Sequence, residues 1–468
     1  MDSPNISFSR ISKLLVDGCQ LSIQHALERR ERFEVTLECG ADVGRSRTLQ
    51  LAVLTAANIA DRCFPRAAKV VLDDSLRDAR LLVWPVIEST FGEAIANVVG
   101  QENVKIAGTS EIGGRVLLFG DAPPVHNAIR VTFDGWIGKV APAARVDRLP
   151  ERQYCTLSGV LAGALAVSEV FLSFAGLNIM AGRRVVGLSL WRPDLPITDP
   201  DALGMEIEFL PGDLWVLGLG HLGNSYLWAL AALPYANAGA TEVYLSDFDK
   251  IEPENVETGM IFSPADEGTL KTRVCSRWLE ARGFRTRLIE RPFDSHFRCH
   301  TVEPQLEPRL ALCGFDSNPV RRDLATAGFL HVIESGLGGT KDNFDTISFH
   351  TLPNPRRVQE LWPDLSAEEQ DARRAYLDRI ALENPAYTAL ATDPCGRAEL
   401  AGKSVAVPFV GATAATLVLA DAIRLFHDGP AYTDIKMSLS DLDRRFAQRT
   451  SNYRPQDFAG VGTVNVSG

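Results

Sequence analysis

Residues 214–247 read LWVLGLGHLGNSYLWALAALPYANAGATEVYLSD, and this stretch decides the fold. It begins with a short apolar run, passes through a glycine turn into a helical pattern over 224–233, and ends with a β-rich run over 242–246. Strand, glycine turn, helix and strand within about 30 residues predict a right-handed βαβ unit. The second half of the chain is therefore expected to contain a parallel sheet.

The turn in this stretch carries Gly218, Gly220 and Gly223. Glycines at such a turn let backbone N–H groups approach an anion at the N-terminus of the next helix, where the helix dipole favours negative charge. Asp247 follows the second strand, where an acid would accept hydrogen bonds from ribose hydroxyls. These four residues predict a nucleotide site, but they do not separate ATP from NAD.

The rest of the second half continues this pattern. Apolar runs bounded by turn residues predict further strands, with helices between them, as a doubly wound sheet requires. We place these strands at 287–290, 310–314, 331–335 and 346–350.

The first half reads as a weaker copy of the same fold. It has a strand pattern, a loosened glycine turn, a helical pattern and a strand ending in acid, at 33–39, 40–44, 46–60 and 70–73. A second similarity between the halves is that residues 159–169 align with residues 411–421, with glycine, alanine, leucine and acidic residues at matching positions. We predict an α/β protein with two Rossmann-like doubly wound domains, the first degenerate, that form a pseudo-dimer. The Pro-rich stretch 191–200 is the expected linker between domains at 1–195 and 196–468.

Composition excludes several classes of function. The chain has 468 residues with 46% hydrophobic and 23% charged residues, and its net charge of −11 makes nucleic acid a poor partner. The N-terminus lacks a signal pattern and no run of about 18 uninterrupted apolar residues occurs, so we expect a cytoplasmic protein with no membrane partner. The 8 cysteines stand singly, without a CxxC pair, which argues against a disulfide framework and against a four-thiolate zinc site.

The segment after the second strand separates ATP from NAD. It reads SDFDKIEPENVETG over 246–259 and DEGTLK over 266–271. This resembles the ThiF/MoeB and ubiquitin-activating enzyme superfamily, whose adenylation domain carries an Asp-x-Asp, a following Asn and a D-x-G-x-x-K segment. The resemblance implies that Asp247 and Asn255 contact the nucleotide, with Asp249 beside them, and that Lys271 binds its phosphates. Displacement at an α-phosphate needs cations on the leaving pyrophosphate, whereas hydride transfer has no need of that lysine.

A second matching segment reads CGFDSNPVRR over 313–322. The superfamily places an Asp, an Asn and an Arg here, so the resemblance implies that Asp316 lies beside Mg²⁺ and that Asn318 and Arg321 belong to the nucleotide site. Hard oxygen ligands such as the carboxylate of Asp316 suit Mg²⁺. The run HVIESGLGG over 331–339 matches the strand and glycine turn that lie along the incoming C-terminal tail.

The sequence departs from the superfamily pattern after Asn255. An Arg and a Gln usually follow there and touch the γ-phosphate, but Thr258 and Gly259 occupy the matching positions. Positive charge on the triphosphate must then come from elsewhere, or catalysis is slow. The superfamily also borrows an arginine across the dimer or pseudo-dimer interface from a segment near the N-terminus, and Arg10 fits that position.

One cysteine stands out because it lies in a polar loop. Cys395 precedes the run PFVG over 408–411, and ubiquitin-activating members and some ThiF relatives place a nucleophilic cysteine in the segment that crosses over here. Arg397 beside it would favour the thiolate. Cys395 is therefore the candidate nucleophile, whereas Cys275 and Cys313 are expected to be buried packing residues.

Among the superfamily's members, the chain looks most like the activating enzymes of bacterial ubiquitin-like conjugation operons, the Bil-type anti-phage systems. The resemblance implies ATP and Mg²⁺ as cofactors, a ubiquitin-like protein and a ubiquitin-conjugating-like enzyme as partners, and it leaves a homodimer open. The implied chemistry has two stages, in which an acyl-adenylate forms first and Cys395 then displaces AMP to give a thioester.

Three alternatives remain open. A sulfur-carrier adenylyltransferase would need no thioester on Cys395. An NAD-dependent oxidoreductase would explain the glycines and Asp247, but not Lys271 together with Asp316. A catalytically dead scaffold gains weight from Thr258 and Gly259.

Overall fold

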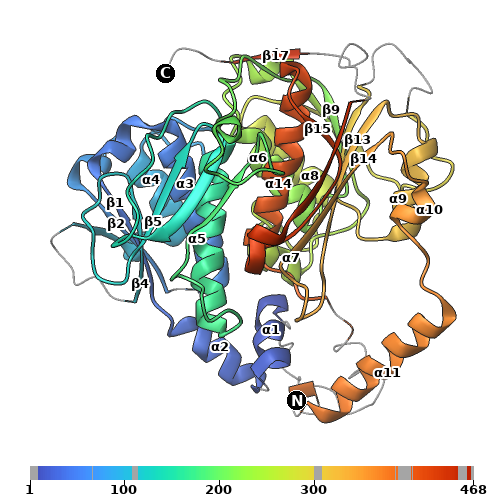
Figure 1. Cartoon of the computed structure of the whole chain (residues 1–468), viewed down its shortest axis with the longest axis horizontal. Coiled ribbons are helices and arrows are strands. Elements are labelled where there is room, and N and C mark those ends of the chain that lie inside the picture. The colour runs from blue at the N-terminus through green and yellow to red at the C-terminus, as the bar shows by residue number, and fades with distance from the viewer. Residues whose placement is uncertain are drawn as a thin grey trace.

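The computed structural model describes residues 9–19, 21–65, 67–107, 114–299, 308–384, 386–387, 402, 404–451 and 461–464. Two β-sheets, one from each half of the chain, lie on either side of a central group of helices (Figure 1).

The sheet of the second half has eight strands in the order β11-β10-β9-β12-β13-β14-β15-β16. The first five strands of that order run parallel, and the last three are antiparallel. The bounds are β9 Leu214–Leu217, β10 Glu242–Ser246, β11 Arg285–Ile289, β12 Leu310–Cys313, β13 His331–Leu337, β14 Thr346–Leu352, β15 Ala431–Ser438 and β16 Phe446–Thr450. A separate small pair joins β8 (Phe209–Pro211) to β17 (Val461–Thr463).

The sheet of the first half has seven strands in the order β3-β2-β1-β4-β5-β6-β7. Its first five strands are parallel and its last two antiparallel. The bounds are β1 Val35–Cys39, β2 Ala68–Leu72, β3 Val104–Ile106, β4 Arg115–Phe119, β5 Ile129–Asp134, β6 Ile137–Pro142 and β7 Val186–Ser189.

Both sheets therefore follow one plan. In each, the third, second, first, fourth and fifth strands lie side by side in that order and run parallel, and an antiparallel extension follows the fifth. Two halves that share this strand order confirm the predicted α/β fold with two Rossmann-like units. The predicted strands are present with ends shifted by at most two residues, because periodicity fades where a strand enters a turn.

Helices connect these strands. Their bounds are α1 Arg10–Cys19, α2 Ile23–Glu31, α3 Arg47–Cys63, α4 Phe91–Val99, α5 Leu157–Ala175, α6 His221–Ala231, α7 Pro253–Thr258, α8 Lys271–Glu280, α9 Asn318–Asp323, α10 Val358–Leu361, α11 Ala367–Glu383 and α14 Pro408–Arg424. The two aligned segments, 159–169 and 411–421, fall within α5 and α14. Their similarity therefore identifies equivalent helices of the two halves.

Alternate residues of a strand face opposite sides of the sheet, and β9 shows this. Leu214 and Val216 belong to the large core shared with the central helices. Trp215 and Leu217 face the other side and pack in a separate cluster with Phe297. Both faces of this strand are covered, which is why its sequence is an unbroken apolar run.

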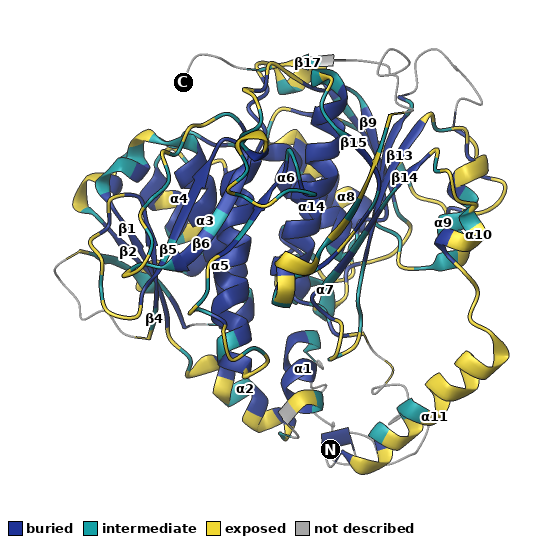
Figure 2. Cartoon of the chain, in the orientation of Figure 1, coloured by how far each residue is buried: buried dark blue, intermediate teal, exposed yellow. Residues whose placement is uncertain are grey.

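The central layer consists of α3 and α5 from the first half and α6 and α14 from the second, with α5 packed on α14 (Figures 1 and 2). Two segments, Leu157–Ala175 and Pro408–His427, are long and apolar enough to span a membrane by composition, but 94% of each tested window is buried. The two apolar helices are core helices of this fold.

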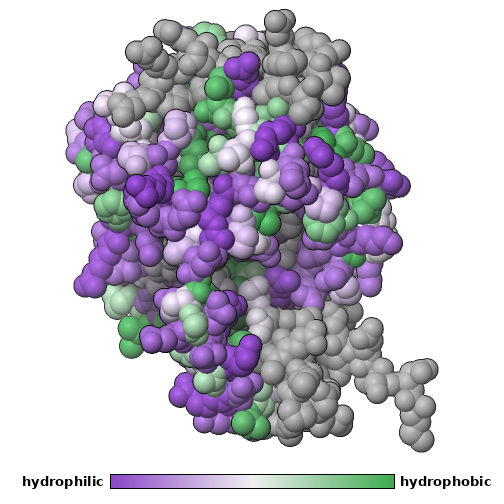
Figure 3. Space-filling view, turned by 90° about the vertical axis from the view of Figure 1, so that its right-hand side faces the viewer, coloured by the Kyte–Doolittle hydropathy of each residue, from purple (hydrophilic) through white to green (hydrophobic). Residues whose placement is uncertain are grey.

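Figure 3 shows that the face over α9 and α10 is largely hydrophilic, with scattered apolar residues.

Two arginines tie the halves together reciprocally. Arg184, from the first half, pairs with Glu169 at 2.6 Å and donates to the backbone oxygens of Leu439 and Ser440 in the second half. Arg424, from the second half, pairs with Asp421 at 2.5 Å and donates to the backbone oxygen of Leu190 in the first. Glu169 and Asp421 therefore each position an arginine that donates hydrogen bonds to backbone oxygens of the opposite half.

Close packing of α5 on α3 depends on glycine. A Cβ at Gly163 would lie 2.5 Å from the backbone oxygen of Ala52, so Gly163→Ala is expected to lower the free energy of unfolding by about 2 kcal/mol through overpacking. The control is Gly18→Ala in α1, where the nearest atom would lie 3.9 Å away, and the better helix propensity of alanine should stabilise by up to about 1 kcal/mol. Denaturant unfolding of both variants measures this, and equal stability changes would contradict it.

Candidate active site

The turn between β9 and α6 is shaped by its glycines. Gly218 has a φ of +78°, and a Cβ at Gly223 would lie 2.0 Å from the backbone oxygen of Gly218, so both positions need glycine. A Cβ at Gly220 would meet nothing within 4 Å. The turn is tight on its protein side and open at Gly220, as a cradle for phosphate requires.

Asp247 closes this turn from the end of β10. Its two carboxylate oxygens accept hydrogen bonds from the backbone N–H groups of Leu219, at 2.7 Å, and Asp249, at 2.8 Å. Burial raises the pKa of Asp247, and the nearby charge of Lys271 opposes that rise. The carboxylate of Asp247 is thus fixed beside the glycine turn, at the end of the second strand of the βαβ unit.

Lys271 is the first residue of α8 and is brought to the same place. Its Nζ lies 2.9 Å from Oδ2 of Asp249, and its backbone N–H donates to the backbone oxygen of Asp249 at 3.0 Å. Lys271 is 7% exposed, while the Asp249 side chain is half exposed. The ammonium group is therefore held next to Asp247 by an acid that itself reaches solvent.

Asn255 lies in α7, a short helix beside the turn. Its Oδ1 accepts a hydrogen bond from the backbone N–H of Glu252 at 3.0 Å, so this atom caps the helix. Thr258 is buried and donates to the backbone oxygen of Glu254, and a Cβ at Gly259 would lie 3.1 Å from Oδ1 of Asn224. Thr258 and Gly259 thus serve packing, and they bring no charge to the site.

Positive charge comes to this region from the first half. Arg10 in α1 pairs with Glu254 at 3.0 Å and donates to Oγ of Ser404 at 3.3 Å. Its charge contributes to lowering the pKa of His221, the first residue of α6, so the guanidinium lies near the glycine turn. The N-terminal helix of the first half therefore contacts α7 of the second half, and the role implied for Arg10 stays a prediction.

Two further arginines of the first half bind the same segment, and no local sequence pattern predicted them. Arg30 pairs with Glu257 at 2.8 Å, and Arg62 donates to the backbone oxygens of Val256 and Met260. Their partners lie in and just after α7, more than 190 positions along the chain. They fix the segment that departs from the superfamily pattern.

Asp316 lies in the loop after β12, directly after Gly314 and Phe315, which lie against Gly218 of the glycine turn. Asp316 is exposed, and among the described residues no hydrogen bond or ion pair engages its carboxylate. Asn318 begins α9 and donates from Nδ2 to the backbone oxygen of Pro363 at 3.2 Å. A carboxylate left free in this way fits a Mg²⁺ ligand, which is an oxygen donor.

Arg321 points inward rather than toward the turn. Its Nε donates to the backbone oxygen of Phe315 at 2.8 Å and lies 3.0 Å from Oε1 of Glu334, which is 1% exposed. The other oxygen of Glu334 lies 2.9 Å from Nδ1 of His350. Sequence reasoning missed the Glu334–His350 pair, because its members are brought together by the antiparallel register of β13 and β14. Together they hold the loop that carries Asp316.

The equivalent turn of the first half is filled by the protein itself. A Cβ at Gly40 would lie 2.0 Å from the carboxylate of Asp121, and one at Gly120 would lie 2.0 Å from that of Asp42. Arg148 pairs with Asp42 and with Glu151. Carboxylates occupy the space that an anion would need, so this half is degenerate as a phosphate site, as its loosened glycine turn predicted.

Cys395 and Arg397 lie outside the described residues, so the candidate nucleophile remains a prediction. Cys275 and Cys313 are free and buried, as expected from their strand and helix positions. Burial raises the pKa of both thiols well above the usual range, which keeps them protonated and unreactive.

His221 makes the protein sensitive to acid. Its Nε2 is buried without a hydrogen-bond partner among the described residues, and burial lowers its pKa from 6.5 to about 4. Between these values the unfolded chain binds more protons than the folded one, so stability should fall as the pH decreases from about 6.5 to about 4. Calorimetry over this range should show a drop in Tm of a few degrees that is smaller in His221→Asn. Identical pH dependence in the two proteins would contradict the assignment.

Known proteins resemble this chain along most of its length. Family models described as the BilD N-terminal domain and the BilD C-terminal domain match residues 34–190 and 210–429. The bacterial E1-like protein BilD of Collimonas sp. (strain OK412) is 34% identical over 437 residues, which are 92% of this chain and 91% of that protein.

Solved structures are similar over shorter stretches. E. coli MccB is 18% identical over 51% of this chain and 62% of its own length, with a TM-score of 0.35, so the match spans just under two thirds of MccB. E. coli tRNA N6-threonylcarbamoyladenosine dehydratase, TcdA, is 15% identical over 46% of this chain and 86% of its own, with a TM-score of 0.30. The two domain models and the curated relative confirm the predicted superfamily and its Bil-type branch, and the chain therefore belongs to the BilD family of bacterial E1-like proteins.

Proposed function

We propose that this protein uses ATP and Mg²⁺ to adenylate the C-terminal carboxylate of a ubiquitin-like protein. The observation that carries the proposal is the meeting of Asp247, Lys271 and the open glycine turn at Gly220. An acid for ribose and a cation for phosphate thus lie close together beside an anion cradle. The freely exposed Asp316 supplies the fourth element, a metal-side carboxylate.

Each residue has a distinct task in this chemistry. Backbone N–H groups of the glycine turn bind phosphate oxygens, and Asp247 accepts the ribose hydroxyls. Lys271 neutralises the charge of the leaving pyrophosphate. Because its ammonium group is paired with Asp249, the phosphates must compete with that carboxylate. Arg10 adds charge from the first half and replaces what Thr258 and Gly259 do not provide. Mg²⁺, when bound at Asp316, shields the charge of the triphosphate.

The Glu334–His350 pair acts one step further from the reaction. Because Glu334 holds Arg321, and Arg321 holds the backbone oxygen of Phe315, the loop is fixed directly before Asp316. Asn318 and Arg321 are therefore proposed to position the site rather than to bind phosphate, because their side chains are engaged within the protein.

A second stage would follow adenylation. Attack of the Cys395 thiolate on the acyl carbon of the adenylate forms a thioester and releases AMP, and the acyl group then passes to the cysteine of a ubiquitin-conjugating-like enzyme. We further propose that this occurs in the cytoplasm and serves antiviral defence, as the Bil-type resemblance implies. A sulfur-carrier adenylyltransferase remains the alternative and would stop after adenylation.

ATP–pyrophosphate exchange tests the proposal. Purified protein is incubated with ATP, Mg²⁺, labelled pyrophosphate and, in turn, members of a panel of ubiquitin-like proteins that end in glycine. Label should enter ATP with one member of the panel and not with the same protein lacking its last glycine. Exchange excludes both an oxidoreductase and a catalytically dead scaffold, and its absence with a cognate partner from the same operon would contradict the proposal.

A further inference from the structure

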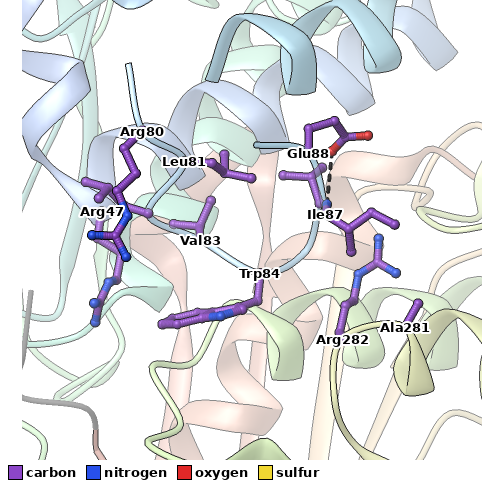
Figure 4. A pocket seen from close by; sticks show the side chains of 11 residues that line it. Arg47, Arg80, Leu81, Val83, Trp84, Ile87, Glu88, Ala281 and Arg282 are labelled. Carbon is purple, nitrogen blue, oxygen red and sulfur yellow. Dashed lines mark hydrogen bonds between the residues drawn. The ribbon is translucent and has the colours of Figure 1, made fainter. Parts of the chain in front are cut away.

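A cavity of about 370 Å³ lies between the two halves, away from the glycine turn. The N-terminus of α3 and the segment 80–88 form its first-half wall, and Ala281 and Arg282, directly after α8, close it from the second half (Figure 4). Its volume is within the range of small-molecule sites. No residue assigned above to adenylation lines it.

The walls of this cavity are fixed before any ligand binds. Gln50 of α3 is buried, and its side chain donates to the backbone oxygen of Arg80 and accepts from the backbone N–H of Leu82. On the opposite side, Arg282 donates twice to the backbone oxygen of Pro85, at 3.0 and 2.7 Å. The segment is therefore held at both ends, from both halves of the protein.

One end of the cavity collects positive charge that the protein does not neutralise. Arg47 and Arg80 lie there together in Figure 4, and among the described residues neither guanidinium has a carboxylate partner or a hydrogen-bond acceptor. Burial lowers the pKa of Arg47, and no acid offsets that cost. The same residue begins α3, whose dipole adds positive potential at this point. An anion would satisfy both guanidinium groups.

The rest of the lining offers apolar surface from Trp84 and Ile87, with Glu88 and Arg282 as its charged members. The indole of Trp84 forms the floor between the arginines and Ile87, with the Arg47 guanidinium 5.1 Å from its ring centroid (Figure 4). Ile87 is 61% exposed and lines the cavity, so it offers apolar surface to a ligand. Aromatic side chains bind the faces of nucleobases in this way, independently of base identity.

From these features we propose that the cavity is a second small-molecule site, which binds a nucleoside monophosphate with its phosphate on Arg47 and Arg80 and its base on Trp84. A phosphate with two guanidinium partners is the geometry that arginine provides best. The residues proposed to bind the ligand, Arg47, Arg80 and Trp84, belong to the first half, and Ala281 and Arg282 of the second half line the same cavity. This site is separate from the proposed adenylation site and stands without it.

Equilibrium dialysis with labelled AMP tests the proposal in the full-length Asp247→Ala variant, which removes nucleotide binding at the glycine turn. We expect one AMP per chain to bind saturably. Arg80→Glu should weaken this binding at least tenfold, and because Arg80 is exposed the fold should be kept. Arg77→Glu, an equal charge change on an exposed neighbour outside the cavity, is the matched control and should bind AMP normally.

Trp84→Ala tests the base, with circular dichroism to confirm folding. This substitution should weaken AMP binding about tenfold. The Kd of inorganic phosphate, obtained by competition, should stay the same. AMP binding that is absent in Asp247→Ala, or that survives Arg80→Glu at full strength, would overturn the site. The nucleotide assignment would be overturned if inorganic phosphate displaced AMP at equal concentration and Trp84→Ala had no effect on AMP binding.

Discussion

Asp316→Ala and Lys271→Ala are each expected to abolish ATP–pyrophosphate exchange, with losses of about 100-fold or more. Both groups act on a triphosphate whose charge must be neutralised as pyrophosphate leaves, and removal of one such electrostatic group typically costs that much. The carboxylate of Asp316 is exposed, so its removal should leave the fold intact. Lys271 is buried against Asp249, so its variant also requires a check by thermal unfolding.

Matched substitutions separate these roles from general damage. Asp323→Ala, at the end of the same helix α9, removes an equal charge and should keep near-normal exchange. Lys271→Arg keeps the charge but changes its geometry, so partial activity is expected. Near-normal exchange in Asp316→Ala or Lys271→Ala would show that the site has been assigned to the wrong residues.

Cys395→Ala is expected to remove the reductant-sensitive adduct between the enzyme and the ubiquitin-like protein completely, while pyrophosphate exchange stays intact. The two stages use different groups, because adenylation needs the phosphate site and thioester formation needs a thiolate. A non-reducing gel of wild type and variant with ATP, Mg²⁺ and the cognate partner measures the adduct. Exchange on the same samples measures the first stage.

Buried cysteines serve as controls for this experiment. Cys299→Ala and Cys313→Ala remove thiols that are buried, so the adduct should form in both variants. An adduct that persists in Cys395→Ala and vanishes in one of these two would move the nucleophile. If wild type forms no adduct although exchange proceeds, the sulfur-carrier alternative is favoured.

Local patterns in the sequence were enough to predict the architecture and the position of the glycine turn. The glycine turn and Asp247 could be predicted because the turn, the helix and the acid follow one another within one βαβ unit. Lys271 was identified by resemblance to the superfamily's D-x-G-x-x-K segment, and it is the first residue of α8. The equivalence of α5 and α14 was visible because two core helices of a duplicated fold keep the same small residues.

Long-range pairings could not be predicted in the same way. Glu334 and His350 meet through the register of two antiparallel strands, and no local pattern fixes that register in advance. Arg30 and Arg62 reach α7 only because the two halves pack against each other. The cavity at Trp84 depends on both halves, so its arginines read in the sequence as ordinary surface charges.

We expect the α-phosphate of ATP to become joined to the C-terminus of a ubiquitin-like protein. The most direct measurement is to incubate the protein, Mg²⁺ and the cognate partner with ATP labelled either in the α- or in the γ-phosphate, and to follow the label under acidic, denaturing conditions. We predict that α-label, and not γ-label, co-migrates with the ubiquitin-like protein, and that deletion of its terminal glycine abolishes the signal. Transfer of γ-label, or no transfer of α-label by an enzyme that binds ATP and the partner, would contradict the account.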